Sequence, residues 1–179
     1  YLSNDISTGP IPNDTDEFLK SEKEVKEKID FFINNNGKHP VDYFHKKLGK
    51  IMWEKCGMAR NKKELNEAIQ EISKLRKLFW KEIKVPGSNN EFNEELAKAG
   101  RVADFLELGE LFAKDSLERE ESCGGHFREE HQTQEGEAMR KNEFQYVSAW
   151  EYVGDPKDAI LHREELIFDD IDVKERSYK

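Results

Sequence analysis

The sequence predicts a mainly α-helical protein, a three- to four-helix bundle followed by a small C-terminal β-hairpin. Two observations carry this prediction. Apolar residues recur at helical spacing in four segments between residues 17 and 122, and capping residues, Gly or Pro bound each segment. From about residue 143 the apolar pattern changes to the alternation that is typical of strands. With 11% aromatic residues, the chain of 179 residues can form a packed core.

Three shorter helices are expected first. The first follows the capping residues 14–16 and ends at residues 34–40, and its apolar positions are Phe18, Val25, Ile29 and Phe32. The second has Pro40 in its first turn and ends at Gly57, with apolar positions Val41, Phe44, Leu48 and Ile51. The third is capped by Asn61 and ends before the break at 85–90, with apolar positions Leu65, Ala68, Ile72, Leu75 and Phe79.

The fourth and longest helix is expected from residue 92 to about Glu121, before Gly124-Gly125. Its apolar positions alternate by four and three residues and are interrupted only at Glu110: Phe92, Leu96, Ala99, Ala103, Leu106, Ala113 and Leu117. Four further residues widen the stripe: Val102, Phe105, Gly109 and Phe112. A stripe this wide should contact more than one neighbour, so we expect a spectrin-repeat-like arrangement.

The last third of the chain predicts the hairpin. Residues 143–152 and 159–168 read as two strands, and residues 153–156 have turn composition. An isolated hairpin is marginal in water, so it must lie on the helices or on another domain. The polar start at Tyr1 suggests a linker. We therefore divide the chain into a linker from an upstream domain (1–16), a helical bundle (17–122), and a turn, hairpin and tail (123–179).

Bulk properties exclude several classes. The net charge of −9 comes with both signs interspersed, so nucleic acid is not an expected partner. Two cysteines cannot form a disulfide framework, which favours an intracellular protein. No apolar run approaches the roughly 20 residues that span a membrane, so direct membrane insertion is not expected.

The segment ESCGGHFREEH, residues 121–131, contains a thiol, two imidazoles and several carboxylates. A metal hydrolase using Cys123, His126 and His131 is one hypothesis, but the two histidines are five residues apart and would diverge on a helix. A Cys123 nucleophile with His126 as base is another, although nearby carboxylates oppose thiolate formation. A polar helix end and loop is the interpretation that the residues favour, so no catalytic or metal-ligating residue is predicted.

Two blocks resemble the C-terminal domain of succinate dehydrogenase and fumarate reductase flavoprotein subunits. In residues 46–75 the family's Met-Trp, Gly-x-x-Arg-Asn and following helix are matched by Met52, Trp53, Gly57, Arg60, Asn61, Leu65 and Ala68. In residues 106–131 its Arg-x-Glu-Ser-Arg-Gly-Ala-His-x-Arg motif is matched by Arg119, Glu121, Ser122, Gly124, His126 and Arg128. The closing residues resemble the family's Arg-x-Tyr tail through Arg176 and Tyr178. Cys123 and Gly125 depart from the usual Arg and Ala, so no role of that Arg is transferred.

This resemblance implies a non-catalytic domain that braces an upstream FAD-binding domain. The parent enzyme would interconvert succinate and fumarate and pass electrons through FAD to an iron–sulfur subunit, next to a membrane cytochrome b anchor. It would lie peripherally on the cytoplasmic side of the inner membrane. The chain has no G-x-G-x-x-G, so FAD is expected upstream, and these residues alone are expected to be inactive. Residues implied to stabilise the turn or a domain interface are Arg60, Arg119, Ser122, His126, Arg128, Arg176 and Tyr178. The alternative is a stand-alone helical adaptor.

Overall fold

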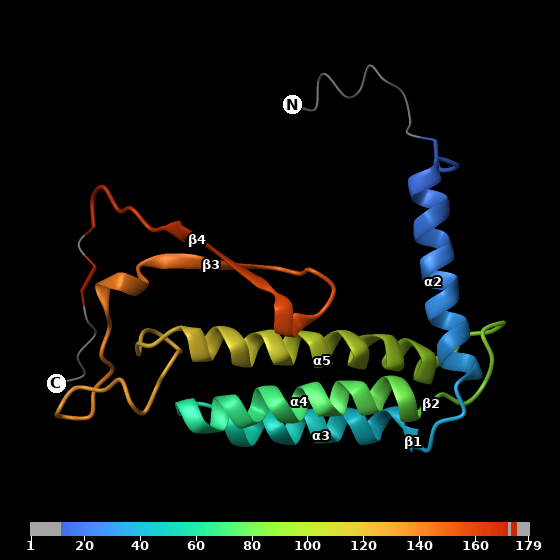
Figure 1. Ribbon diagram of the computed structural model, residues 1–179, viewed down its shortest axis with the longest axis horizontal. Coiled ribbons are helices and arrows are strands. Elements are labelled where there is room, and N and C mark those ends of the chain that lie inside the picture. The colour runs from blue at the N-terminus through green and yellow to red at the C-terminus, as the bar shows by residue number, and fades with distance from the viewer. Residues whose placement is uncertain (1–11, 172, 175–179) are drawn as a thin grey trace.

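The computed structural model describes residues 12–171 and 173–174, and within them four α-helices dominate. The helices are α2 (Asp16–Asn34), α3 (Val41–Lys55), α4 (Lys62–Glu82) and α5 (Glu94–Glu118). Short strands β1 (His39–Pro40) and β2 (Ile83–Lys84) pair in parallel beside the bundle. The 3-10 turn η2 (Asn142–Phe144) leads into β3 (Tyr146–Glu151), and η3 (Pro156–Asp158) leads into β4 (Ile160–Glu165). The predicted fold class, a helical bundle with a C-terminal hairpin, is confirmed (Figure 1).

Helices α3, α4 and α5 pack together around the main apolar core. Their starts are fixed locally, because the side chain of Asn61 accepts from Glu64 N at 2.9 Å and that of Asn93 accepts from Leu96 N at 3.1 Å. The predicted apolar stripes meet in this core, whose most deeply buried members include Val41, Phe44, Leu65, Ala68, Ile72, Phe79, Ala99, Leu106 and Ala113. The wide stripe of α5 contacts both α3 and α4, as predicted.

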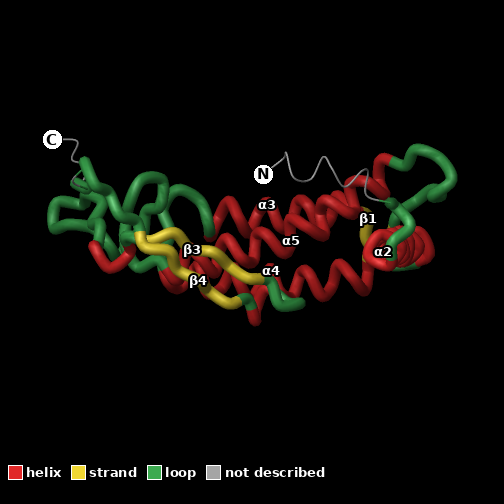
Figure 2. Tube along the Cα trace, turned by 90° about the horizontal axis from the view of Figure 1, so that it is seen from above, coloured by secondary structure: helices red, strands yellow, loops and turns green. Residues whose placement is uncertain are grey.

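Helix α2 does not join the bundle along its length. It stands across the end of the bundle in Figure 1 and is seen almost end-on in Figure 2. Only Phe32, in its last turn, is buried, where its ring stacks on Trp80 at 5.5 Å. Phe18 is 49% exposed and Val25 is 57% exposed, so the apolar face predicted for this helix is not used in the core. The apolar spacing predicted that α2 is a helix, but it did not predict which part of the molecule α2 contacts.

Two other expectations about α5 are corrected by the structure. The apolar spacing predicts Phe92 on the stripe, but Phe92 precedes the helix and is 90% exposed, because Asn93 is the cap. The helix ends at Glu118, with Arg119 as its C-cap, rather than near Glu121. The side chain of Arg128, which follows the helix, donates hydrogen bonds to carbonyl groups in the last turn of α5, as described below.

Strands β3 and β4 form the antiparallel hairpin, with register from Tyr146↔Glu165 to Glu151↔Ile160. The hairpin lies along the C-terminal half of α5 (Figures 1 and 2), and the indole Nε1 of Trp150 donates to Asp115 Oδ1 at 2.8 Å. Across the described residues, no helix is long and apolar enough to cross a membrane.

Candidate functional site

The candidate site is the turn that follows α5, together with the turn between α3 and α4. Arg60 comes from the α3–α4 turn, and Arg119, Ser122, His126 and Arg128 come from the segment after α5. The two segments are joined through the backbone, because Arg60 N donates to Phe127 O at 3.1 Å and Glu129 N donates to Arg60 O at 2.8 Å. The structure therefore brings five of the seven predicted residues together. Arg176 and Tyr178 lie outside the described residues.

Arg128 closes the C-terminal end of α5. Its side chain is only 1% exposed, and Nη1 donates to Ser116 O at 2.9 Å and to Leu117 O at 3.1 Å. These carbonyl groups belong to the last helical turn, where a cation also interacts favourably with the helix dipole. Nε pairs with Glu130 Oε2 at 3.2 Å, and Arg128 N donates to Ser122 Oγ at 2.8 Å. A buried charge is tolerated here because several acceptors surround it.

His126 links Arg60 to the end of α5. Arg60 Nη1 lies 2.9 Å from His126 Nδ1, and His126 Nε2 lies 2.9 Å from Arg119 O. An arginine can only donate and a carbonyl can only accept, so Nδ1 accepts the first bond and Nε2–H donates the second. The imidazole is then neutral. Burial, together with the charges of three arginines, lowers the pKa of His126 in spite of its bond to Arg119 O.

Arg119 connects the same turn to the hairpin. Its Nη1 pairs with Glu121 Oε1 at 2.9 Å and donates to Phe144 O at 2.9 Å, and its Nη2 donates to Tyr146 O at 3.0 Å. Glu121 is buried and also accepts from Lys141 N at 2.9 Å. The turn is thus a junction at which the helical hairpin α3–α4, the end of α5 and the start of β3 are held together.

Cys123 faces solvent at the outer edge of this turn. Its backbone pairs with His126, with Cys123 N donating to His126 O at 2.9 Å, and Gly124 adopts φ +59°, which favours glycine. No group of three or more His, Cys, Asp or Glu side chains that could hold a metal ion occurs among the residues that the structure describes. The metal-hydrolase hypothesis on Cys123, His126 and His131 therefore has no ligand cluster to support it.

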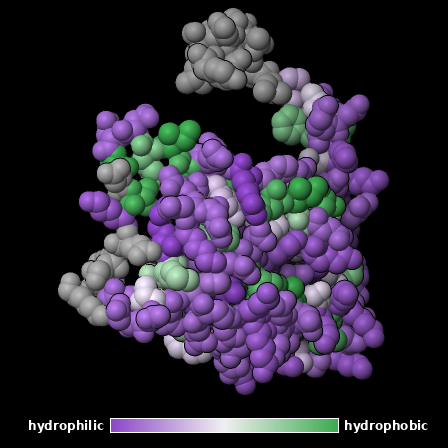
Figure 3. Space-filling model, turned by 60° about the vertical axis from the view of Figure 1, so that its left-hand side comes forward, coloured by the Kyte–Doolittle hydropathy of each residue, from purple (hydrophilic) through white to green (hydrophobic). Residues whose placement is uncertain are grey.

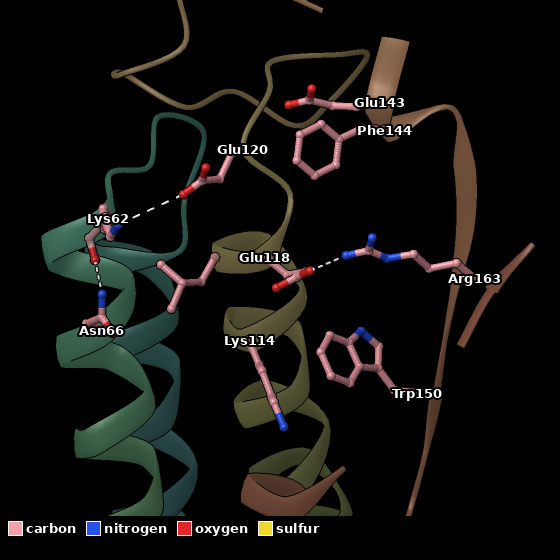
Figure 4. Close-up of a pocket in the computed structure, with 10 residues that line it drawn as sticks. Lys62, Asn66, Lys114, Glu118, Glu120, Glu143, Phe144, Trp150 and Arg163 are labelled. Carbon is pink, nitrogen blue, oxygen red and sulfur yellow. Dashed lines mark hydrogen bonds and ion pairs between the residues drawn. The ribbon is translucent and has the colours of Figure 1, made fainter. Parts of the chain in front are cut away.

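A cavity between α4, α5 and the hairpin was not predicted from the sequence. Figure 4 shows Lys62 near Glu120 (3.9 Å) and Arg163 paired with Glu118 (2.6 Å) across a cavity of about 630 Å³. Lys114 lies over the Trp150 ring at 4.8 Å from its centroid. These contacts join segments that are far apart in sequence, so no local motif could have indicated them. The charged groups around this cavity pair with one another, and they do not converge on a common point where a substrate could bind.

A comparison with protein families matches residues 45–178 to the family described as "Fumarate reductase flavoprotein C-term". The chain belongs to this family. It is a C-terminal domain of a fumarate reductase or succinate dehydrogenase flavoprotein subunit.

Curated relatives agree with this family. The fumarate reductase flavoprotein subunit of Helicobacter pylori (strain J99) is 33% identical over 106 residues, covering 59% of this chain and 15% of the relative. The corresponding flavoprotein of Haemophilus influenzae is 24% identical over 106 residues, covering 59% of this chain and 18% of the relative. This C-terminal domain therefore matches less than one fifth of the length of these relatives.

Solved structures share the fold. The chain is similar to a quinol–fumarate reductase solved with menaquinol, with a TM-score of 0.75 and 19% identity over 93% of this chain and 28% of the other. It is also similar to the Mycobacterium smegmatis Sdh1 complex in the apo form, with a TM-score of 0.67 and 24% identity over 82% of this chain and 24% of the other. At these identities the likeness is one of fold.

Proposed function

We propose that this C-terminal domain belongs to an enzyme subunit that interconverts succinate and fumarate. In this proposal, FAD and the dicarboxylate site lie in the preceding part of the subunit, and electrons pass through FAD to an iron–sulfur subunit. A membrane cytochrome b anchors the complex, so the subunit lies peripherally on the cytoplasmic side of the inner membrane. The names of the relatives support the proposal, because relatives that align with this chain are named fumarate reductase flavoprotein subunits.

The described residues do not fit a flavin site of their own. Dinucleotide binding of this kind uses a glycine-rich turn between a parallel strand and a helix. The only parallel pair of strands among the described residues, β1–β2, is two residues long on each strand, and its connection holds no G-x-G-x-x-G. We therefore assign no step of the reaction to this domain and propose that it braces the FAD-binding domain.

The observation that supports the bracing role is the exposed apolar surface on α2 and α5. Figure 3 shows separate apolar patches on the arm of α2, along the middle of the molecule and at the hairpin end, with hydrophilic surface between them. On α2 the exposed residues are Phe18, Leu19 and Val25, and on α5 they are Phe105, Leu108 and Phe112. An exposed apolar surface that is surrounded by charged residues is typical of a protein–protein or domain–domain contact.

The α5 part of this surface is hollowed into a groove against α3. The groove has a volume of about 280 Å³ and an almost wholly apolar lining: His45, Leu48, Gly49, Met52, Phe105, Leu108, Gly109 and Phe112. Gly109 lets α5 lie close to α3 here, because an added Cβ would lie 3.3 Å from Leu48 Cδ1. The relatives extend well beyond the matched region, so the preceding part of the same subunit is the proposed occupant.

The test is a Leu108→Asp change in the full-length subunit. Leu108 is 63% exposed here, so the domain itself should remain folded. A leucine buried at an interface contributes about 1.5–3 kcal/mol, and a carboxylate there is more costly still. We expect the variant subunit to unfold at lower temperature, to release FAD more readily and to lose fumarate reduction, measured by calorimetry, flavin fluorescence and dye-coupled assay.

Phe92→Asp is the matched control, because Phe92 is also apolar and exposed but lies in the loop before α5, outside the groove. The control should behave like the wild type. A Leu108→Asp subunit with unchanged unfolding temperature and FAD retention would refute the proposed docking face. A full-length subunit with no fumarate or succinate turnover in its unmodified form would refute the parent activity instead.

A further inference from the structure

Arg76, on α4, joins the bundle to the tip of the hairpin. Its Nε donates to Glu110 Oε2 on α5 at 3.1 Å, and its Nη2 donates to Asp155 Oδ1 at 2.8 Å. Arg76 and Glu110 are buried, whereas Asp155 is partly exposed and also accepts from Lys157 N at 3.0 Å as the cap of η3. The residue that interrupts the apolar stripe of α5 is therefore part of a buried ionic contact between two helices and the hairpin.

The charges in this contact do not balance. One guanidinium faces two carboxylates, so the group carries a net charge of −1 when all three residues are ionised. Glu110 is 1% exposed, and its Oε1 is buried without a hydrogen-bond partner among the described residues. Leaving a buried carboxylate oxygen unpaired is costly.

The groups that act on Glu110 come from both elements packed beside it. Burial raises the pKa of Glu110 above its usual 4.5, and Asp155 at the hairpin tip raises it further, while Arg76 and Lys77 of α4 oppose the rise. The pKa of Asp155 is lowered instead, first by its bond from Lys157 N and then by Arg76. Of the two carboxyl groups, Glu110 is therefore the one whose pKa is shifted toward the protonated form.

The rest of the seam between the hairpin and α5 is also mainly polar. Lys114 Nζ donates to three carbonyl groups at the hairpin tip, including Lys157 O and Ala159 O at 3.0 Å each. Two further links are Trp150 to Asp115 and Arg163 to Glu118. No hairpin residue belongs to the main apolar core of the described chain. Lifting the hairpin from α5 would therefore leave that core closed, although it would uncover Pro156 and Ala159, which are buried at the hairpin tip.

We propose that Arg76, Glu110 and Asp155 form a proton-controlled clasp that holds the hairpin on the bundle when Glu110 is protonated and loosens when Glu110 ionises. With Glu110 neutral, Arg76 and Asp155 form a balanced pair across the seam. With Glu110 ionised, lifting the hairpin removes Asp155 and leaves a balanced Arg76–Glu110 pair. Closing the hairpin onto the bundle thus takes up a proton at Glu110. Because the pKa of Glu110 is raised above 4.5 in the closed state, the closed state is favoured at low pH and is lost as the pH rises above 4.5 and through that raised pKa.

The test is hydrogen exchange of the whole chain by NMR from about pH 5 to about pH 8, after correction for the intrinsic pH dependence of exchange. We expect the protection of the β3–β4 amides and of the Trp150 indole N–H to fall as the pH rises. The fall should be about tenfold for each unit by which the pKa of Glu110 differs between closed and open states. Amides of α4 report in the same spectra whether the bundle remains folded.

Three variants separate the clasp from a general loss of packing. E110Q cannot ionise, so its hairpin should stay protected at about pH 8 without pH dependence in this range. D155N leaves Glu110 and Arg76 as a balanced pair and should expose the hairpin at every pH. The matched control E118Q removes a carboxylate two turns further along α5 and should keep the wild-type pH dependence.

The proposal is overturned if E110Q retains the wild-type pH dependence. It is also overturned if wild-type hairpin protection is constant over this range while α4 remains protected. Neither outcome depends on the bracing role proposed above, because the experiment measures only this chain.

Discussion

Apart from the Arg76–Glu110 pair, apolar side chains fill the interface between α4 and α5, whereas hydrogen bonds and ion pairs cross most of the interface between α5 and the hairpin. The first interface is formed by residues such as Leu65, Ile72 and Leu106, which have no exposed surface. The second uses contacts such as Arg163 to Glu118, at which both side chains are well exposed. Burial of apolar area contributes far more per residue than an exposed ion pair does. The bundle should therefore resist conditions that release the hairpin.

The largest expected effect is in the bundle. Phe79 has no exposed surface and packs against Phe32 and Phe44. Phe79→Ala should lower the free energy of unfolding by about 3–5 kcal/mol, because it removes one buried ring and leaves a cavity. Denaturant unfolding followed by circular dichroism measures this loss. A loss under about 1 kcal/mol would mean that the bundle is not held by this core.

An intermediate effect is expected at the junction between the two regions. Arg128→Met keeps most of the buried volume but leaves the carbonyl groups of Ser116 and Leu117 without their donor. The cost should be about 1–3 kcal/mol, measured in the same unfolding experiment. Arg101→Met is the control, since Arg101 is exposed on α5. Equal stability of the two variants would show that the Arg128 cap is dispensable.

The smallest effect is expected in the seam. Glu118→Gln removes the partner of Arg163 and should change the free energy of unfolding by about 0–1 kcal/mol. The difference should disappear in about 1 M salt, where exposed charges are screened. Unfolding of wild type and variant at low and high salt measures this. A larger, salt-independent loss would contradict the contrast between the apolar and polar interfaces.

Much of the fold could be predicted because its signals are local. Asn61 is the cap of α4 within three residues of the group it bonds, and the stripe from Leu65 to Phe79 shows one buried face. The two strands of the hairpin were also indicated by alternation. Local periodicity does not specify a helix's neighbour, which is why the exposed arm of α2 could not be predicted.

The contacts of the candidate site depended on distant partners. The motif in residues 119–128 indicated a turn, but nothing near it pointed to Arg60, which is 66 residues from His126. Glu110 was visible only as a gap in an apolar stripe, because its partner Arg76 is 34 residues away and Arg76 is 79 residues from Asp155. Whether Arg60, Arg119, Ser122, His126 and Arg128 also contact another domain stays a prediction.

The two cysteines differ in exposure, so their rates of chemical labelling can report on unfolding of the chain. Cys123 lies exposed at the outer edge of the junction, whereas Cys56 is buried in the bundle core, where burial raises the pKa of its thiol. Alkylating reagents attack the thiolate, so Cys123 should be modified at once and Cys56 only when the core opens. Counting labels over time by mass spectrometry would then follow global unfolding of the bundle without any added dye, tag or engineered residue.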